Sequence, residues 1–203
     1  MKLLLIANGE PVNINLADLK TFDKIICVDG GLNLLRFDII PDVIIGDFDS
    51  IDVKKMDLLR AKSKIVYKNT QEISDLNFAL QYCLKFRPDE ITIINAISTD
   101  RFDHSLCNIL LLMRICRNIH VEIITKTQKI FMVHKEIMLK NLDSKTISII
   151  PLTNCKHVVT DGLKWEIDSD LKFGFINGIS NVVVSKLAKI SLEKGKLLVI
   201  TEI

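Results

Sequence analysis

The sequence predicts an α/β fold followed by a second part built of strands alone. Short apolar runs alternate with helix-like segments as far as about residue 125, and from about residue 130 only short apolar runs and turns follow. Hydrophobic residues make up 48% of the chain, mostly Ile, Leu and Val, and only 6% of residues are aromatic. Alternating strands and helices are typical of a mostly parallel sheet with helices on both faces, and runs of short strands are typical of an antiparallel sandwich.

Composition excludes several classes of protein. The net charge of +2 gives no electrostatic indication of a nucleic-acid or membrane partner. No apolar run reaches the roughly 18 residues that a membrane span needs, and the apolar start, Met1–Ala7, is too short for a signal peptide. The five cysteines are scattered without zinc-site spacing, which favours reduced core thiols in a cytoplasmic protein.

The first part should contain six strands and four main helices. The expected strands are residues 3–7, 25–28, 43–45, 64–67, 91–94 and 121–125, and the expected helices are 33–37, 51–59, 76–84 and 106–116. Asp49 or Ser50 should cap the second helix. Ser74 should cap the third, with Asp75 in its first turn, where the helix dipole favours a carboxylate.

The second part should contain only strands. The expected strands are residues 129–134, 136–140, 145–150, 155–160, 173–176, 182–186 and 196–201. No Pro/Gly/Ser-rich linker separates the two parts, and we place the boundary within 126–135. The predicted domains are therefore 1–130, with a Rossmann-like sheet, and 131–203, an antiparallel β-sandwich.

The most informative stretch is Pro41–Ser50, where a buried strand ends in Gly46 and then presents Asp47 and Asp49. Side chains two apart in an extended chain point the same way, so these carboxylates could share one cation. Oxygen ligands suit Mg²⁺, which usually bridges to substrate phosphates. The alternative is that both aspartates only cap the helix that follows.

Polar groups also follow three other expected strands. They are Asp29-Gly30-Gly31, the group Gln71, Ser74 and Asp75, and the group Arg101, Asp103 and His104. Each alone has a structural reading as a turn, a helix cap or a surface ion pair. The carboxyl ends of parallel strands meet at one edge, however, so these groups should converge.

The combination predicts a magnesium–phosphate site, because an Arg at a helix N-terminus adds a bidentate phosphate donor to the carboxylates. Phosphoryl-type transfer needs mainly positioning and charge neutralisation. The sequence contains no Walker loop, no dinucleotide-binding glycine fingerprint and no serine in a nucleophile elbow.

In the second part, Trp165 is the only tryptophan. Alternation would place it on the same face as Leu163, which indicates a core position. Gly178–Asn181 reads most simply as a turn.

These motifs together resemble the thiamine pyrophosphokinase family over nearly the whole chain. The resemblance rests on Asn8-Gly9-Glu10, Asp29-Gly30-Gly31, Gly46-Asp47-Phe48-Asp49-Ser50, Gln71 with Ser74-Asp75-Leu76, Arg101-Phe102-Asp103-His104, Gly162-Leu163-Lys164-Trp165 and Ile179-Ser180-Asn181. It implies transfer of a pyrophosphoryl group from ATP to the thiamine hydroxyl, which yields thiamine diphosphate and AMP. It also implies a homodimer with an α/β catalytic domain, a β-sandwich domain and active sites at the interface.

The resemblance further implies roles for individual residues. Asp47, Asp49 and Asp75 would hold Mg²⁺, and Asp49, Asp75, Arg101 and Asp103 would form the catalytic group. ATP would contact Asp29, Gly30, Gly31, Gln71, Ser74, Arg101 and His104. Thiamine would stack on Trp165 beside Ser180 and Asn181, which reverses the core interpretation of Trp165.

The chain departs from the family pattern before Arg101. Ala96 and Thr99 stand where the family usually has glycines. Two alternatives therefore accompany the main prediction. One is a pyrophosphotransferase or phosphotransferase that acts on another small alcohol, and the other is a catalytically impaired regulator that binds nucleotide or thiamine.

Overall fold

A computed structural model describes residues 1–13, 15–36, 38–115, 118–175 and 178–203. The chain divides into two compact units, Met1–Lys126 and Thr127–Ile203. No helix within the described ranges is long and apolar enough to cross a membrane.

The N-terminal unit contains a sheet whose strands all run parallel. Its strands are β1 (Lys2–Ile6), β2 (Lys24–Val28), β3 (Val43–Gly46), β4 (Lys64–Tyr67), β5 (Glu90–Ile94) and β6 (His120–Ile124). Their order across the sheet is β6-β5-β1-β2-β3-β4. Strands β2 to β4 extend from β1 toward one edge of the sheet, and β5 and β6 extend from it toward the other. An open parallel sheet generally binds ligands where its strand order reverses in this way.

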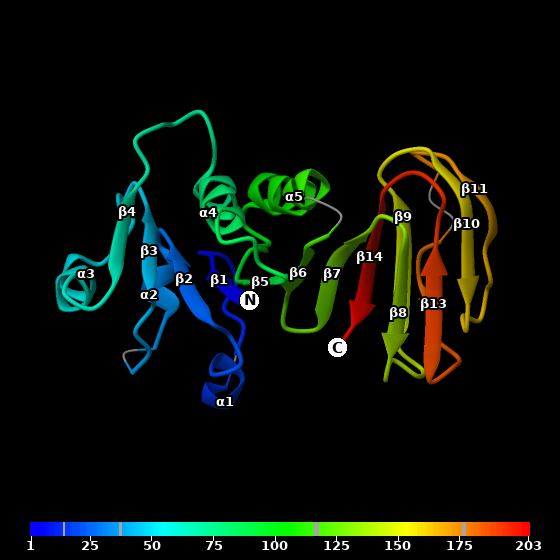
Figure 1. The fold of residues 1–203 in the computed structure, drawn as a ribbon, viewed down its shortest axis with the longest axis horizontal. Coiled ribbons are helices and arrows are strands. Elements are labelled where there is room, and N and C mark those ends of the chain that lie inside the picture. The colour runs from blue at the N-terminus through cyan, green and yellow to red at the C-terminus, as the bar shows by residue number, and fades with distance from the viewer. Residues whose placement is uncertain (14, 37, 116–117, 176–177) are drawn as a thin grey trace. The chain divides into compact units, whose positions relative to one another are not determined.

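Helices cover both faces of this sheet. They are α1 (Leu16–Leu19), α2 (Gly31–Leu34), α3 (Val53–Leu59), α4 (Asp75–Leu84) and α5 (Phe102–Leu111), followed by the 3₁₀ turn η1 (Leu112–Arg114). In Figure 1, α4 and α5 lie on one side of the strands, and α1 and α2 lie on the other. Consecutive residues Leu3, Leu4 and Leu5 are all fully buried, as a parallel sheet covered on both faces requires.

Several details of this unit differ from the prediction, and one agrees with it. Ser74 caps α4 as expected, accepting a hydrogen bond from the Asn77 amide. The cap of α3 is Asp52, so the prediction of Asp49 or Ser50 at that position was wrong. Helix α5 begins at Phe102, four residues before the predicted start, and the short helix α1 was not predicted.

The cysteines differ in exposure. Cys27, Cys83 and Cys155 are buried as expected, and burial raises the pKa of both Cys27 and Cys83 to about 12. Cys107 is exposed, contrary to the prediction of core thiols. Cys116 lies outside the described residues, as do Phe37 and Ile176, the last residues of a predicted helix and a predicted strand.

The C-terminal unit is built from two antiparallel sheets. Its strands are β7 (Gln128–Val133), β8 (Glu136–Lys140), β9 (Thr146–Pro151), β10 (Cys155–Asp161), β11 (Asp168–Leu171), β12 (Asn181–Val182), β13 (Leu187–Ser191) and β14 (Leu197–Glu202). One sheet has the order β12-β9-β14-β7 and the other β11-β10-β13-β8. Buried residues from both sheets, such as Ile149, Val199, Val158 and Ile190, form one core cluster.

Four features of this unit differ from the prediction. Strands β11 and β13 were not predicted, and the strand predicted at 182–186 shrinks to Asn181–Val182. The described residues of the strand predicted at 173–176 form a turn. Leu163 is buried and Trp165 is 56% exposed, so the two do not share a face. Alternation fails there because residues 163–166, which follow Gly162 with its φ of 85°, form an irregular segment.

Candidate active site

Three carboxylates meet where β2 and β3 end. Asp29 follows β2, and Asp47 and Asp49 follow β3; one oxygen of each lies within 4.8 Å of the others. Phe48, between the paired aspartates, has a φ of 69°, so the chain is not extended there as the sequence argument assumed. The carboxylates converge nevertheless, because this left-handed residue turns the loop back toward Asp29.

The electrostatics of the cluster separate its members. Repulsion from the Asp47 carboxylate, with desolvation and the Asp29 charge, raises the pKa of Asp49. The pKa of Asp47 is lowered, chiefly because Gln71 Nε2 donates to Asp47 Oδ2 at 3.2 Å. A cation placed between these groups would relieve the repulsion that Asp49 experiences.

The donor set fits a hard divalent cation. Asp29 Oδ2 accepts a hydrogen bond from Ser50 Oγ, while Asp29 Oδ1 is buried and has no hydrogen-bond partner among the described residues. A buried carboxylate oxygen without a donor is costly unless a cation or water satisfies it. Oxygen ligands alone favour Mg²⁺ over softer metals.

Asn33 fixes the loop that carries these aspartates. Its Nδ2 donates to Ser50 O at 2.8 Å, and its Oδ1 accepts from the Asp52 amide at 2.9 Å. The side chain thus ties α2 to both sides of the turn before α3. The sequence pattern predicts only a helical position for Asn33 and gives no indication of this role.

Asp75 lies apart from the three-carboxylate group. It is the first residue of α4, as predicted, and its Oδ1 lies 3.0 Å from Nζ of the buried Lys68. The structure therefore groups Asp29 with Asp47 and Asp49, and pairs Asp75 with a lysine that the sequence analysis did not single out.

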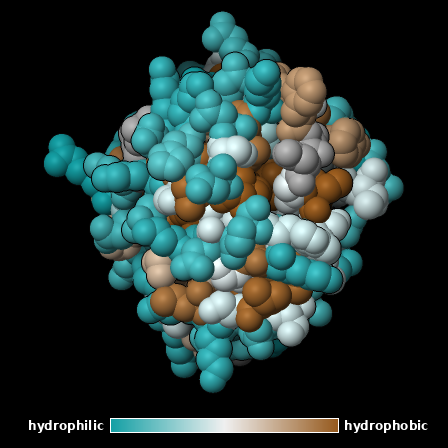
Figure 2. All heavy atoms as spheres, turned by 90° about the vertical axis from the view of Figure 1, so that its right-hand side faces the viewer, coloured by the Kyte–Doolittle hydropathy of each residue, from teal (hydrophilic) through white to brown (hydrophobic). Residues whose placement is uncertain are grey.

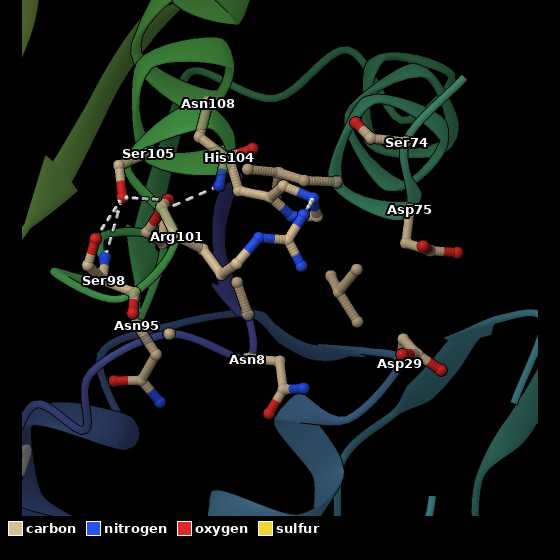
Figure 3. Close-up of a pocket in the computed structure, with 15 residues that line it drawn as sticks. Asn8, Asp29, Ser74, Asp75, Asn95, Ser98, Arg101, His104, Ser105 and Asn108 are labelled. Carbon is tan, nitrogen blue, oxygen red and sulfur yellow. Dashed lines mark hydrogen bonds between the residues drawn. The ribbon is translucent and has the colours of Figure 1, made fainter. Parts of the chain in front are cut away.

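A cavity of about 280 Å³ opens at the same edge of the sheet. Five predicted site residues line it: Asp29, Ser74, Asp75, Arg101 and His104. Five polar residues that were not predicted also line it: Asn8, Asn95, Ser98, Ser105 and Asn108. Figure 3 shows the Arg101 guanidinium pointing toward the middle of the cavity, with Asp29 and Asp75 on the opposite side.

The two predicted glycines act on the backbone and do not line the cavity. A Cβ at Gly30 would lie 2.2 Å from the Asn8 side chain, and one at Gly31 would lie 2.2 Å from Ile6 O. Gly31 therefore lets the turn after β2 pack directly against the backbone at the end of β1, which no larger residue allows, and Gly30 leaves room for the Asn8 side chain.

Arg101 binds Asp103 through two contacts, Nε to Oδ1 at 3.1 Å and Nη2 to Oδ2 at 3.0 Å. The hydrogen bonds from Arg101 lower the pKa of Asp103 to about 2. Arg101 also contacts His104 Nε2. Arg101, the predicted phosphate donor, is therefore also a member of the surface ion pair that the sequence offered as the alternative.

Side chains hold the segment that contains Ala96 and Thr99, where the family resemblance leads us to expect glycines. Ser105 Oγ accepts from the Ser98 amide at 2.9 Å and donates to Ser98 O at 2.8 Å. Asn108 Nδ2 donates to Ala96 O at 2.8 Å, and the Thr99 amide donates to Glu10 Oε1 at 3.1 Å. The contact between α5 and this segment has one signal in the sequence. Two polar residues, Ser105 and Asn108, stand three positions apart on one side of the apolar helix.

A second cavity lies within the C-terminal unit. It measures about 720 Å³, and all three residues predicted to contact thiamine line it: Trp165, Ser180 and Asn181. The buried Asn181 accepts from the Trp165 amide at 3.1 Å and donates to Trp165 O at 2.6 Å. Asn181 therefore positions the backbone of Trp165, whose ring stays exposed with Lys164 Nζ 4.6 Å from its centre.

Comparison with known protein families shows which family the chain belongs to. Residues 17–125 match the profile "Thiamin pyrophosphokinase, catalytic domain", and residues 134–197 match "Thiamin pyrophosphokinase, vitamin B1 binding domain". The chain belongs to the thiamin pyrophosphokinase family. A thiamine pyrophosphokinase of Bacillus subtilis (strain 168) is 32% identical over 212 residues, which cover 98% of each chain. Thiamin pyrophosphokinase 1 of Caenorhabditis elegans is 28% identical over 88% of this chain and 80% of its own.

Solved structures of thiamin pyrophosphokinases share the fold. The B. subtilis enzyme superposes with a TM-score of 0.86 at 29% identity, over 100% of this chain and 99% of its own. The Candida albicans structure gives a TM-score of 0.85 at 22% identity, over 100% of this chain and 88% of its own, a likeness of fold alone.

Proposed function

We propose that this chain is a thiamine diphosphokinase that transfers the pyrophosphoryl group of ATP to the hydroxyl of thiamine. The products are thiamine diphosphate and AMP. The observation that carries this function is the cavity at the sheet edge, where Arg101 faces Asp29 and Asp75. A guanidinium opposite carboxylates is the arrangement that a phosphate–metal complex needs, since the cation binds phosphate and the acids bind metal. Membership of the family supplies the identity of the two substrates.

We propose that the two parts of the chain bind different substrates. Residues 1–130 form a Rossmann-like catalytic domain that binds ATP, and residues 131–203 form a β-sandwich that binds thiamine. Asp29, Gly30, Gly31, Gln71, Ser74, Arg101 and His104 form the ATP site in this proposal. Of these, Gln71 acts by fixing Asp47, and the glycines act by bringing the turn against β1.

Magnesium, when bound, would neutralise charge on the phosphates and hold them in line with the incoming hydroxyl. Asp47, Asp49 and Asp75 are its proposed ligands, and the geometry adds Asp29 as a further candidate. The transfer itself forms a bond from the thiamine oxygen to the β-phosphorus and breaks the bond from that phosphorus to the oxygen that leaves with AMP. Arg101 orients the phosphates, and a carboxylate accepts the hydroxyl proton.

The proton acceptor is best sought among the site carboxylates other than Asp103. Asp103 has a pKa of about 2 and is a weak base near neutral pH, whereas repulsion raises the pKa of Asp49. We assign the step to whichever of Asp49 and Asp75 is not bound to the metal, with Asp103 holding Arg101 in place.

Thiamine is proposed to stack its cationic ring system on the exposed ring of Trp165, with Ser180 and Asn181 beside it. The active sites are proposed to form at the interface of a cytoplasmic homodimer. Exposed apolar side chains support this assembly in the C-terminal unit, among them Phe173, Phe175 and Val184. Figure 2 shows apolar areas interrupting the polar surface on one side of the molecule.

One incubation tests the function. The full chain is mixed with ATP, Mg²⁺ and thiamine, and thiamine diphosphate and AMP are measured by mass spectrometry. Equal amounts of both products are expected, and none without thiamine. ADP in place of AMP would indicate a phosphotransferase, and binding of both ligands without products would indicate a regulator. Turnover of another small alcohol but not of thiamine would also overturn the proposal.

A further inference from the structure

Lys68 is a buried cation inside an acidic site. It directly follows β4, and its amide donates to Gly46 O at 2.8 Å, so it is anchored beside the loop of Asp47 and Asp49. Only 3% of its side chain is exposed. Long charged side chains are almost never fully buried unless they are paired.

The partners of Lys68 are site residues. Its Nζ lies 3.0 Å from Asp75 Oδ1 and 3.9 Å from Asp47 Oδ2, and it donates to Ile73 O at 3.1 Å. The ammonium therefore joins the carboxylate at the start of α4 to one that follows β3. Asp47 also belongs to the three-carboxylate group, so Lys68 links the two acidic parts of the site.

A cation at this place competes with a metal for the same negative charge. Lys68 lies between Asp75 on one side and Asp47, a member of the three-carboxylate group, on the other. At 3.0 and 3.9 Å from Nζ to these two carboxylates, Coulomb energies in a site partly shielded from water are large. Lys68 offsets one of these charges permanently, whereas Mg²⁺ would offset two only when it is bound.

We propose that Lys68 is a positioning residue that holds Asp47 and Asp75 in place and weakens the binding of Mg²⁺ to the nucleotide-free site. The metal then binds tightly only together with the phosphates of ATP, whose charge outweighs that of the lysine. This inference rests on the proposed function insofar as the carboxylates are a magnesium site. A lysine that only stabilises the fold would leave the affinity for Mg²⁺ unchanged or, if its loss loosened the loop, would lower that affinity on removal.

Mg²⁺ alone is the probe. The full chain without nucleotide is titrated with Mg²⁺ by calorimetry, and its melting temperature is followed over the same concentrations. Relative to the wild type, Lys68→Met should melt at a lower temperature without metal. It should bind Mg²⁺ on the order of tenfold more tightly or better, because one nearby positive charge is gone. The melting temperature should accordingly rise more with Mg²⁺ than that of the wild type.

Three further variants make the test specific. Lys68→Arg keeps the charge and should keep the wild-type affinity. Lys68→Gln keeps a donor for Ile73 O and should bind Mg²⁺ as Lys68→Met does, which covers the case in which Lys68→Met does not fold. Lys64→Met removes the same charge from the exposed start of β4 and should behave as the wild type.

The outcomes separate this inference from the function. If neither Lys68→Met nor Lys68→Gln binds Mg²⁺ more tightly than the wild type, the inference is overturned, including the case in which no variant binds it. If Lys64→Met matches their gain, net charge explains the effect and the inference is again overturned. Failure of the wild type to make thiamine diphosphate would overturn the function while leaving these metal affinities as measured.

Discussion

Arg101 and Asp103 bind each other in parallel, with Nε 3.1 Å from Oδ1 and Nη2 3.0 Å from Oδ2. This two-point geometry is also the geometry with which a guanidinium binds a phosphate. In the proposed ATP site, the phosphates of ATP therefore compete with Asp103 for the donors of Arg101.

The first prediction concerns Arg101→Lys. A lysine keeps the charge but offers no planar pair of donors, so kcat/KM should fall by about 10- to 100-fold. The melting temperature should barely change, because both partners are exposed. Arg36→Lys is the matched control, since Arg36 contacts Asp38 in the same way at 3.1 and 3.0 Å outside the site. Equal losses in both variants would contradict the role of Arg101.

The second prediction concerns acid stability. The pKa of Asp103 in the fold is about 2, below its unfolded value near 3.8. The pair therefore stabilises the fold above pH 4, and its contribution is lost as the pH falls from about 4 through 2. The melting temperature of Asp103→Asn should fall less steeply with acid over this range than that of the wild type. Parallel curves for the two proteins between pH 5 and 2 would show that the pair does not contribute.

The third prediction is that Asp49→Asn separates stability from activity. Asp47 and Asp29 both repel Asp49, so removing its charge should raise the melting temperature of the metal-free chain. Turnover should fall by about 100-fold or more, even with saturating Mg²⁺ and ATP, because a metal ligand is lost. Asp57→Asn, on α3, should change neither quantity appreciably. Near wild-type turnover of Asp49→Asn would refute the metal assignment.

The fourth prediction tests the contact between α2 and the aspartate loop. Asn33→Leu removes the two hydrogen bonds that reach Ser50 O and the Asp52 amide. Its loss should destabilise the chain by roughly 1–3 kcal/mol, measured as a shift in urea unfolding. The KM for Mg²⁺–ATP should rise as the loop loosens. For comparison, Asn77→Leu removes an exposed contact with Gln81 on α4 and should leave that KM unchanged.

Elements with strong local signals could be predicted from the sequence. The six parallel strands were found because each contains a short run of Ile, Leu or Val, which is buried in all of them except the edge strand β4. Ser74 was found because a hydroxyl before an apolar helix has one dominant use, as a cap. The convergence of Asp29 with Asp47 and Asp49 followed from one topological rule about strand ends.

What the sequence could not reveal depends on tertiary contacts. Lys68 looks like a surface lysine until the fold places Asp75 beside it. Strand β13, Leu187–Ser191, alternates weakly, and only its pairing with β8 and β10 makes it a strand. Asp52 took the cap position because Asn33 holds the preceding turn, a contact between residues 19 positions apart in sequence.

The fifth prediction concerns Trp165, whose ring is exposed at the second cavity while Asn181 fixes its backbone. An aromatic ring held in this way can stack on a cationic heterocycle at little entropic cost. Trp165→Ala should therefore raise the KM for thiamine by about 10- to 100-fold and leave the KM for ATP unchanged, and Trp165→Phe should recover part of the loss. Asn181→Leu should raise the thiamine KM as well, because it releases the backbone of Trp165. Leu58→Ala, on α3, removes apolar surface from an exposed side chain that lines neither cavity, and it should leave both constants unchanged. If Trp165→Ala and Leu58→Ala give the same steady-state constants, thiamine does not bind at this ring.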